Sequence, residues 1–192
     1  MRPGITVAPL VVVLLLASLV SGPALTTAQN GPTPHVLRVN WGDPPPDTLD
    51  PQLSHSGQWG ISGGVDFEGL TKLDERLNPI PGAAESWEFS PDGTTLTFHL
   101  REGLVFSDGV PIIAEHFVYA ARRLCGPELD SRSASLLFNV VGCEELFTSD
   151  GPVPGEADIE LGVRALDDRT VEYRFDAPAP YFPVVAASWG TI

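Results

Sequence analysis

A stretch of alternating residues at positions 84–117 constrains the fold of this chain more than any other part of the sequence. Within it, residues 95–101 alternate between apolar and polar side chains with a period of two. This period places Leu96, Phe98 and Leu100 on one face of a β-strand and the polar residues on the other face. The stretch therefore predicts a sheet with one buried face.

Turn signals divide the same stretch into short strands. In Ser90-Pro91-Asp92-Gly93, the proline fixes φ early in a turn and the glycine accepts a positive φ late in it. Ser107-Asp108-Gly109 is a second turn signal, and it follows a short predicted strand at 104–106. Trp87-Glu88-Phe89 alternates too, and we expect its aromatic side chains to point inward. The pattern is typical of an antiparallel β-meander.

The rest of the chain predicts further strands and helices. The first strand is expected at 36–41, and it ends at a proline-rich run that cannot continue a hydrogen-bonded ladder. The other predicted elements are strands of a small sheet within 70–77 and 83–106, a helix at 114–124, a second helix at 135–146, a hairpin formed by 163–166 and 170–175, and a helix that starts within 181–187.

The stretch from Trp87 to Phe117 resembles the signature region of the family 5 extracellular solute-binding proteins, which are the oligopeptide and dipeptide receptors of ABC importers. Other runs that resemble family elements occur in the same order along the chain: Thr48-Leu49-Asp50-Pro51, Phe67-Glu68-Gly69-Leu70, 81–87, 161–168 and 179–182. The resemblance covers essentially everything after the first 28 residues.

This resemblance implies a fold class and a division into domains. The expected fold is α+β, of the periplasmic-binding-protein-like kind (type II, family 5). Residues 29–66 would be the N-terminal part of the large lobe, including its first strand. Residues 67–192 would be the small mixed-sheet domain with its packed helices and the start of the return to the large lobe. Family members are several hundred residues long, so we expect this sequence to be an N-terminal fragment or a truncated product.

Residues 1–28 have the features of a signal peptide. Arg2 supplies a positive charge, residues 10–17 are an unbroken apolar run, and small residues precede a predicted cleavage site before Gln29. An uncleaved signal anchor is the alternative, although the apolar run is shorter than the ~20 residues needed to span a bilayer. The segment contains no cysteine, so a lipid anchor is not expected. We predict an exported protein, in the periplasm or on the extracellular side of the cell envelope.

Cys125 and Cys143 are the two cysteines of the chain. An oxidising compartment would allow them to form a disulfide. Two separate buried thiols are the alternative, because the sequence does not give the distance between their Cα atoms. Neither interpretation requires a redox-active role.

Composition and spacing argue against several classes of function. The formal net charge of −14 offers no basic surface for nucleic acid. The four histidines have no metal-ligand spacing, so no metal site or cofactor is predicted. Glu144-Glu145 and Asp167-Asp168 are adjacent pairs whose side chains point apart, so we interpret them as solvated charges. The sequence therefore predicts that the protein is not an enzyme.

The resemblance also carries candidate binding residues. In peptide receptors of this family, the loop after the Leu-Asp-Pro element is one wall of the clamp that holds the ligand, and this role would fall on His55, Ser56 and Gly57. Trp59, in the same glycine-rich loop, is a weaker candidate, and a plain surface loop is the alternative interpretation. Leu137 occupies the position of a ligand-contacting tyrosine of the oligopeptide receptors, and it lacks the hydroxyl. This difference puts specificity for oligopeptides in question.

We therefore predict a monomeric solute-binding component of an ABC importer, which captures a peptide or a related small solute between two lobes and delivers it to the permease subunits. Recognition of many peptide sequences would follow from main-chain hydrogen bonding. The alternative is a secreted β-rich envelope or adhesion module without a solute cleft. An extracellular hydrolase is a third and weaker hypothesis, because no nucleophile with an adjacent base is apparent.

Overall fold

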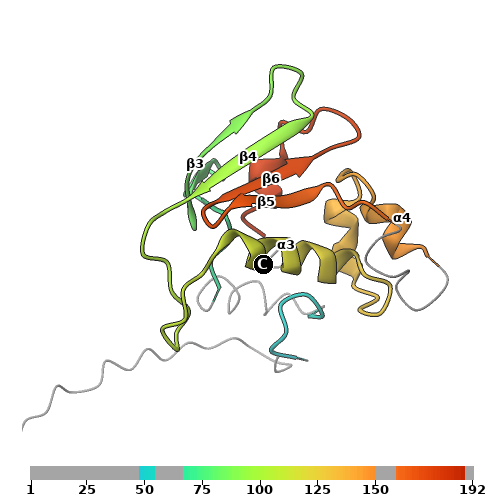
Figure 1. The fold of residues 1–192 in the computed structure, drawn as a ribbon, viewed down its shortest axis with the longest axis horizontal. Helices are drawn as coiled ribbons and strands as arrows, with labels where there is room; N and C mark the ends of the chain where they lie inside the picture. Colours follow the sequence, from blue (N-terminus) through green and yellow to red (C-terminus); the bar gives the residue numbers. More distant parts are fainter. Residues whose placement is uncertain (1–47, 55–66, 150–158, 189–192) are drawn as a thin grey trace, which may run out of the picture. The chain divides into compact units, whose positions relative to one another are not determined.

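A four-stranded antiparallel sheet is the centre of this computed structural model, which describes residues 48–54, 67–149 and 159–188. The strands are β3 (Ala84–Phe89), β4 (Thr95–Leu100), β5 (Val163–Asp167) and β6 (Thr170–Arg174). Their order across the sheet is β3-β4-β6-β5 (Figure 1). Strand β6 of the C-terminal hairpin thus pairs with β4, the strand predicted from the alternation at 95–101, and it lies along the edge of β4 opposite β3.

Alternation along β4 produces the buried face of the sheet as predicted. Leu96, Phe98 and Leu100 are buried, and the residues between them are only partly buried. Phe98 lies opposite Trp87 of β3 and Val171 of β6, so apolar side chains continue across the strands on the same face. Side chains directly opposite each other in an antiparallel pair contact across the strands, and this extends the core over several strands.

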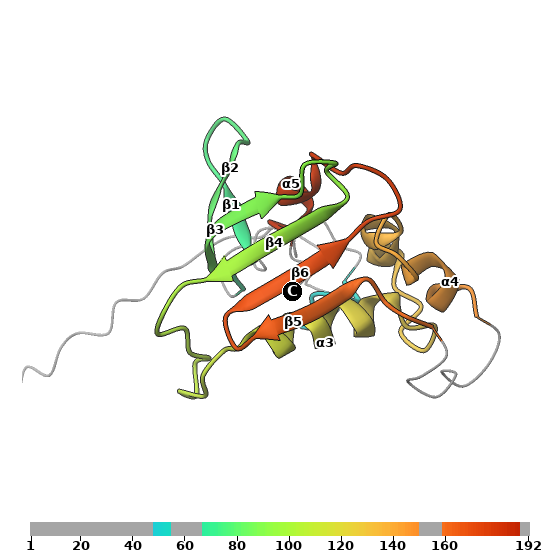
Figure 2. The same ribbon diagram turned by 45° about the horizontal axis from the view of Figure 1, so that its top comes forward.

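Helix α3 (Ala114–Cys125) covers this buried face (Figures 1 and 2). Its buried residues recur at helical spacing: Ala114, Phe117, Val118, Ala121, Leu124 and Cys125. The helix starts where the backbone N–H of Ile113 donates to Nδ1 of His116, 3.1 Å away, and this satisfies one of the unpaired groups of the first turn. The helix predicted at 114–124 is confirmed, and Gly126 follows its last residue as the C-cap.

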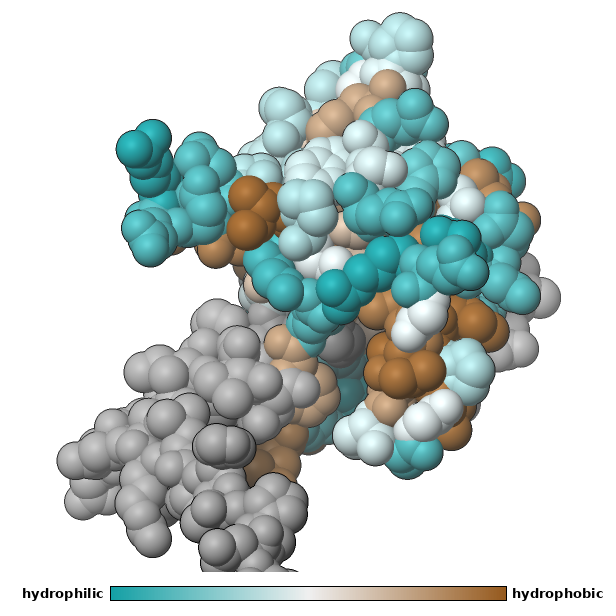
Figure 3. Space-filling model, turned by 90° about the vertical axis from the view of Figure 1, so that its left-hand side faces the viewer, coloured by the Kyte–Doolittle hydropathy of each residue, from teal (hydrophilic) through white to brown (hydrophobic). Residues whose placement is uncertain are grey.

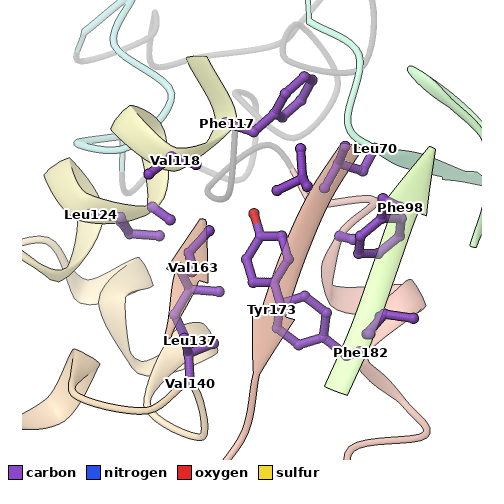
Figure 4. Close-up of a cluster of buried hydrophobic side chains, with 14 of the residues drawn as sticks. Leu70, Phe98, Phe117, Val118, Leu124, Leu137, Val140, Val163, Tyr173 and Phe182 are labelled. Carbon is purple, nitrogen blue, oxygen red and sulfur yellow. The ribbon is translucent and has the colours of Figure 1, made fainter. Parts of the chain in front are cut away.

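The core lies between α3, the sheet and the short C-terminal helix α5 (Phe182–Val185). The ring of Phe182 packs on Tyr173 and Phe175, with centroids 5.0 Å and 4.6 Å apart. Tyr173 in turn meets Phe98 edge to face at 5.9 Å. Figure 4 shows Tyr173 between α3 on one side and Phe182 and Phe98 on the other. The predicted helix within 181–187 is therefore present over a single short segment that caps the aromatic part of the core.

Strands β1 (Thr71–Leu73) and β2 (Pro79–Pro81) form a separate two-stranded sheet. This arrangement corrects the prediction that residues 70–77 belong to the same sheet as 83–106. Close backbone contact holds the base of this hairpin against α5, since Thr71 N–H donates to the carbonyl of Ala186 at 3.4 Å. A Cβ atom at Gly69 would lie 2.4 Å from the same carbonyl oxygen, so only glycine fits there.

The predicted helix at 135–146 is wrong. The chain forms a 3₁₀ helix, η1 (Arg132–Leu137), and a short helix, α4 (Cys143–Phe147), separated by residues 138–142. Between the two, Val140 forms an isolated bridge with Phe175, and Gly142 has a φ of 76°. Pairing with the chain after β6 thus competes with helical hydrogen bonding, and the poor helix formers of this stretch allow that outcome.

Cys125 and Cys143 form a disulfide with Cα atoms 5.1 Å apart. Both cysteines are fully buried. The bridge connects the last residue of α3 to the first residue of α4, which settles the alternative left open by the sequence in favour of pairing.

Two smaller predictions differ from the structure. Residues 104–106 do not form a strand, and Val105 makes only an isolated bridge to Pro111. Phe89 lies opposite Leu96, on the core side, but it is 36% exposed because β3 is an edge strand. The turns at Ser90–Gly93 and Asp167–Arg169 are present, and Gly93 has the positive φ (73°) that the turn requires.

Hydrophobic residues also occur on the surface of the described part of the chain. Figure 3 shows brown hydrophobic patches separated by hydrophilic surface on one face of the molecule. The most exposed large apolar side chains are Leu49, Leu77 and Tyr119. Among the described residues, no helix has the length and apolar character to span a bilayer.

Candidate functional site

The segment 48–54 precedes the predicted ligand-contacting residues and lies against α3, on the side away from the sheet (Figure 1). Its backbone folds on itself, because the N–H groups of Leu53 and Ser54 both donate to the carbonyl of Asp50 at 3.2 Å. The N–H of Gln52 also donates to Oδ1 of Asp50 at 3.0 Å, which is typical of an Asx turn. Asp50 therefore organises this segment internally as well as through its external contacts.

Arg123 of α3 holds Asp50 with both of its terminal nitrogens. Nη1 donates to Oδ1 of Asp50 at 3.1 Å, and Nη2 donates to Oδ2 of the same carboxylate. Nη1 also donates to Oε1 of Gln52 at 2.7 Å. A guanidinium paired with a carboxylate through two parallel bonds fixes direction as well as distance, and such charge-assisted bonds are stronger than neutral ones.

Gln52 is the buried polar residue at the centre of this contact, with only 2% of its surface exposed. Its Nε2 donates to the carbonyl of Ala120 at 2.9 Å, while Oε1 accepts from Arg123. The hydroxyl of Ser131 donates to the carbonyl of Gln52. Both ends of the amide side chain are thus bonded, as a buried polar group requires.

The electrostatics of this contact favour the ionised pair. The hydrogen bond from Arg123 lowers the pKa of Asp50 below its usual value, against the opposing effect of partial burial. The backbone N–H of Gln52 adds to the same effect on the pKa of Asp50. The carboxylate in turn raises the pKa of Arg123. Both shifts favour the ionised form of the pair.

Glu68 makes a second set of ionic contacts, where the described chain resumes after residue 66. Its two carboxylate oxygens contact Nζ of Lys72 and Nη2 of Arg101. Arg101 directly follows β4, and its backbone N–H donates to the carbonyl of Ala83 at 3.0 Å. The residues on both sides of 55–66 are therefore fixed to the folded core by ion pairs.

Most of the predicted binding residues lie outside the described residues. These are His55, Ser56, Gly57 and Trp59. Leu137 lies within the core and is 1% exposed. Figure 4 shows it next to Val140 and below Val163. Its side chain therefore supports the packing of η1, and this burial argues against a direct ligand contact, although that role stays a prediction.

The sequence did not identify Gln52, Arg123 or Ser131 as important. Arg123 is one of two adjacent arginines in α3, and nothing in its neighbourhood distinguishes it from Arg122, which is exposed. Asp50 and Arg123 are 73 positions apart, so only the tertiary structure brings them together. The available signal was the match of Asp50 to the Leu-Asp-Pro element.

A shallow hollow of about 560 Å³ lies beside α4. It is lined by Val141, Gly142, Glu144, Glu145, Thr148, Ile159, Glu160 and Asp176. Glu160 pairs with Arg174, and the other carboxylates face solvent. Across the ranges that the structure describes, no three His, Cys, Asp or Glu residues are placed to hold a metal ion.

The adjacent acidic pairs are exposed, as expected for solvated charges. Glu144 and Glu145 lie on the surface of α4, and Asp167 and Asp168 lie in the turn between β5 and β6. Hydrogen bonds from the backbone of Arg169 and the hydroxyl of Thr170 lower the pKa of Asp167. Turn geometry accounts for this shift.

Comparison with known proteins identifies the family. Residues 78–192 match the family described as "Bacterial extracellular solute-binding proteins, family 5 Middle". The chain is 40% identical over 118 residues to the periplasmic oligopeptide-binding protein OppA of Escherichia coli, which covers 60% of this chain and 21% of OppA. It is 37% identical over 185 residues to the probable deoxycholate-binding periplasmic protein YgiS of the same organism, covering 93% of this chain and 34% of YgiS.

Solved structures agree with the sequence comparison. The structure of Haemophilus influenzae OppA in complex with RPPGFSPFR is similar to this fold, with a TM-score of 0.69 at 33% identity. The similarity covers 76% of this chain and 28% of that one. The chain thus spans about a third or less of the length of these relatives. The family match and the shared fold together show that this chain belongs to the bacterial extracellular solute-binding proteins of family 5.

Proposed function

We propose that the protein is the exported solute-binding component of an ABC importer and that its solute is a peptide. The observation that carries this proposal is the family match, together with identity of 40% to a periplasmic oligopeptide-binding protein. The relatives compared above are named as periplasmic, which supports an exported location. The permease subunits of the importer would be the partners that receive the solute.

The proposed mechanism is capture of the solute between two lobes. A solute that contacts both lobes favours the closed form over the open form, and this shift in population is the signal that the permease reads. An extended peptide offers main-chain hydrogen bonds whatever its sequence, so a clamp that uses them can accept many peptides. His55, Ser56 and Gly57 remain our proposed wall residues, with Trp59 and Leu137 as weaker candidates.

A bile acid is a second candidate solute. YgiS is named as probably deoxycholate-binding, and its similarity extends over 93% of this chain. The loss of the tyrosine at the position of Leu137 is compatible with a solute other than an oligopeptide. The peptide proposal remains first because the structural relative above contains RPPGFSPFR.

Binding without chemical conversion is the expected activity. The two relatives are named as binding proteins, which argues against both the hydrolase hypothesis and the envelope-module alternative. We propose that the protein is not an enzyme.

Isothermal titration of the protein encoded by the natural gene tests the proposed function. The probes are trialanine, dialanine and deoxycholate, with free alanine as the control. We expect saturable binding of trialanine and an increase of the melting temperature that grows with its concentration by mass action. Saturable binding of deoxycholate alone would replace the peptide by a bile acid. Absence of binding to all three probes would contradict the proposal.

A further inference from the structure

The two cysteines of the disulfide cannot be reached from solvent in the folded protein. Cys125 and Cys143 are both 0% exposed, and they belong to the same apolar core cluster as Leu124 and Leu137. Disulfides form and break when a thiolate attacks a sulfur atom to which it has access. A thiol in apolar surroundings stays protonated and is inert. Exchange at this site therefore requires opening of the surrounding structure.

The backbone just before α4 is fixed to the sheet on two sides. The N–H of Val141 donates to the carbonyl of Arg174 at 3.0 Å, and the N–H of Gly162 donates to the carbonyl of Val141 at 2.7 Å. The chain packs so closely here that a Cβ atom at Gly142 would lie 2.5 Å from the carbonyl oxygen of Glu160. Loosening of α4 alone would leave these contacts in place, so it would not free the cysteine at its first position.

Cys125 is held in the same way at the end of α3. Ala121 and Leu124, on the buried side of the helix, are both 0% exposed. Gly126 is buried too, and its N–H donates to the carbonyl of Arg123 at 3.3 Å. Because α3 covers the buried face of the sheet, exposure of Cys125 requires the helix to leave the core. Opening of a core element costs nearly as much free energy as global unfolding, so both sulfur atoms react only in the unfolded chain.

We propose that Cys125 and Cys143 are joined before this part of the chain folds, by an oxidoreductase of the cell envelope that carries a reactive disulfide. Domains of this size fold within about seconds, whereas uncatalysed disulfide exchange takes minutes to hours. Folding would thus bury two thiols before a slow oxidant could join them. The inference concerns the maturation of the protein and goes beyond its proposed function, since it holds whatever solute the protein binds.

The exchange conserves electrons and protons. The thiolate of one cysteine attacks the disulfide of the oxidoreductase, which forms a mixed disulfide and releases one thiolate of the enzyme. The thiolate of the second cysteine then attacks the sulfur of the first, which forms the Cys125–Cys143 bond and releases the second thiolate of the enzyme. Two electrons pass from the chain to the oxidoreductase, whose two released thiolates take up protons in place of those that the cysteines lost.

The first test measures reduction of the bridge by dithiothreitol in the protein encoded by the natural gene, in native buffer and in denaturing urea. The thiols that appear at Cys125 and Cys143 are alkylated and quantified by peptide mass spectrometry. We expect reduction in native buffer to be about a hundredfold slower than in urea, or slower still. The control is S107C, whose new thiol lies on an exposed loop and is blocked as a mixed disulfide with glutathione. Its reduction should proceed at similar rates in both solutions.

The second test measures formation of the bridge in the reduced protein. A bacterial dithiol oxidase in its disulfide form is added either at the moment of dilution from urea or after refolding. We expect the bridge to form about a hundredfold faster in the chain that has not yet folded. Oxidised glutathione at the same concentration should join far fewer of the chains before they fold.

Two results would overturn the inference. One is reduction in native buffer as fast as in urea, and the other is equal rates of bridge formation before and after refolding of a reduced chain that folds. Oxidised glutathione that bridges the diluted chains as completely as the oxidase would overturn the need for a protein donor. A reduced chain that does not fold would support oxidation before folding, and the comparison with glutathione would then decide whether a protein donor is needed.

Discussion

The disulfide between Cys125 and Cys143 connects the end of α3 to the beginning of α4, and both cysteines are completely buried. The bridge encloses a stretch with little regular structure, which includes η1 and the isolated bridge at Val140. It also lies two residues after Arg123. The covalent link thus stabilises the part of the chain on which the polar contact with segment 48–54 is built.

Loss of this disulfide should destabilise the protein strongly. The bridge spans 18 positions, and restricting the unfolded chain over such a loop contributes about 3 kcal/mol to the free energy of unfolding. We expect the double variant C125S/C143S to show a loss of this size in urea unfolding. Reductant should lower the stability of the wild type and leave that of the double variant unchanged. Equal stability of the oxidised and the fully reduced wild type would contradict the prediction.

Ionisation of Asp50 should make stability dependent on pH in the acid range. Its folded-state pKa is lowered by Arg123, so the stabilisation is fully present above the unfolded pKa of about 3.9. It is lost as the pH falls through the still lower folded-state pKa. We expect D50N to be less stable than the wild type by about 1.5 kcal/mol at pH 7, which is the lower end of the range found for hydrogen bonds to charged groups.

The difference between D50N and the wild type should therefore shrink as the pH falls below about 4. Urea unfolding at a series of pH values measures it. The control is E85Q, which removes the exposed partner of Arg169 and should cost at most about 0.5 kcal/mol at pH 7. A constant difference between D50N and the wild type across this pH range would show that the carboxylate charge is not responsible.

Replacement of Gly69 should disturb the junction between the β1–β2 hairpin and α5. The added Cβ of G69A would lie 2.4 Å from the carbonyl oxygen of Ala186, a backbone atom that can move only with its helix. We expect a loss of about 1–3 kcal/mol in the free energy of unfolding, as for other overpacked sites. The control is G126A, whose Cβ would meet nothing closer than 3.4 Å and which should change stability by less than about 0.5 kcal/mol. Equal effects of the two changes would contradict this account.

Local patterns of the sequence predicted β4 and α3, because the spacing of apolar side chains along a strand or helix determines which of its faces is buried. The period-two alternation of Leu96, Phe98 and Leu100 gave the buried face of β4, because a strand that buries one face can hold only that register. The apolar spacing of α3 gave its buried side for the same kind of reason. The resemblance to family 5 was also readable from the sequence, since it depends on the order of short motifs.

Tertiary structure decided the features that depend on contacts between distant parts of the chain. Residues 135–146 broke into η1 and α4 because Val140 pairs with Phe175, which no local pattern reveals. Phe89 alternates like Phe98, but its position on an edge strand leaves it partly exposed. Arg123 and Asp50 look like ordinary surface charges until the fold brings them together across 73 positions. The periodicity of a sequence indicates whether a residue prefers a buried or an exposed position. The partner that the residue contacts depends instead on how distant parts of the chain pack against it.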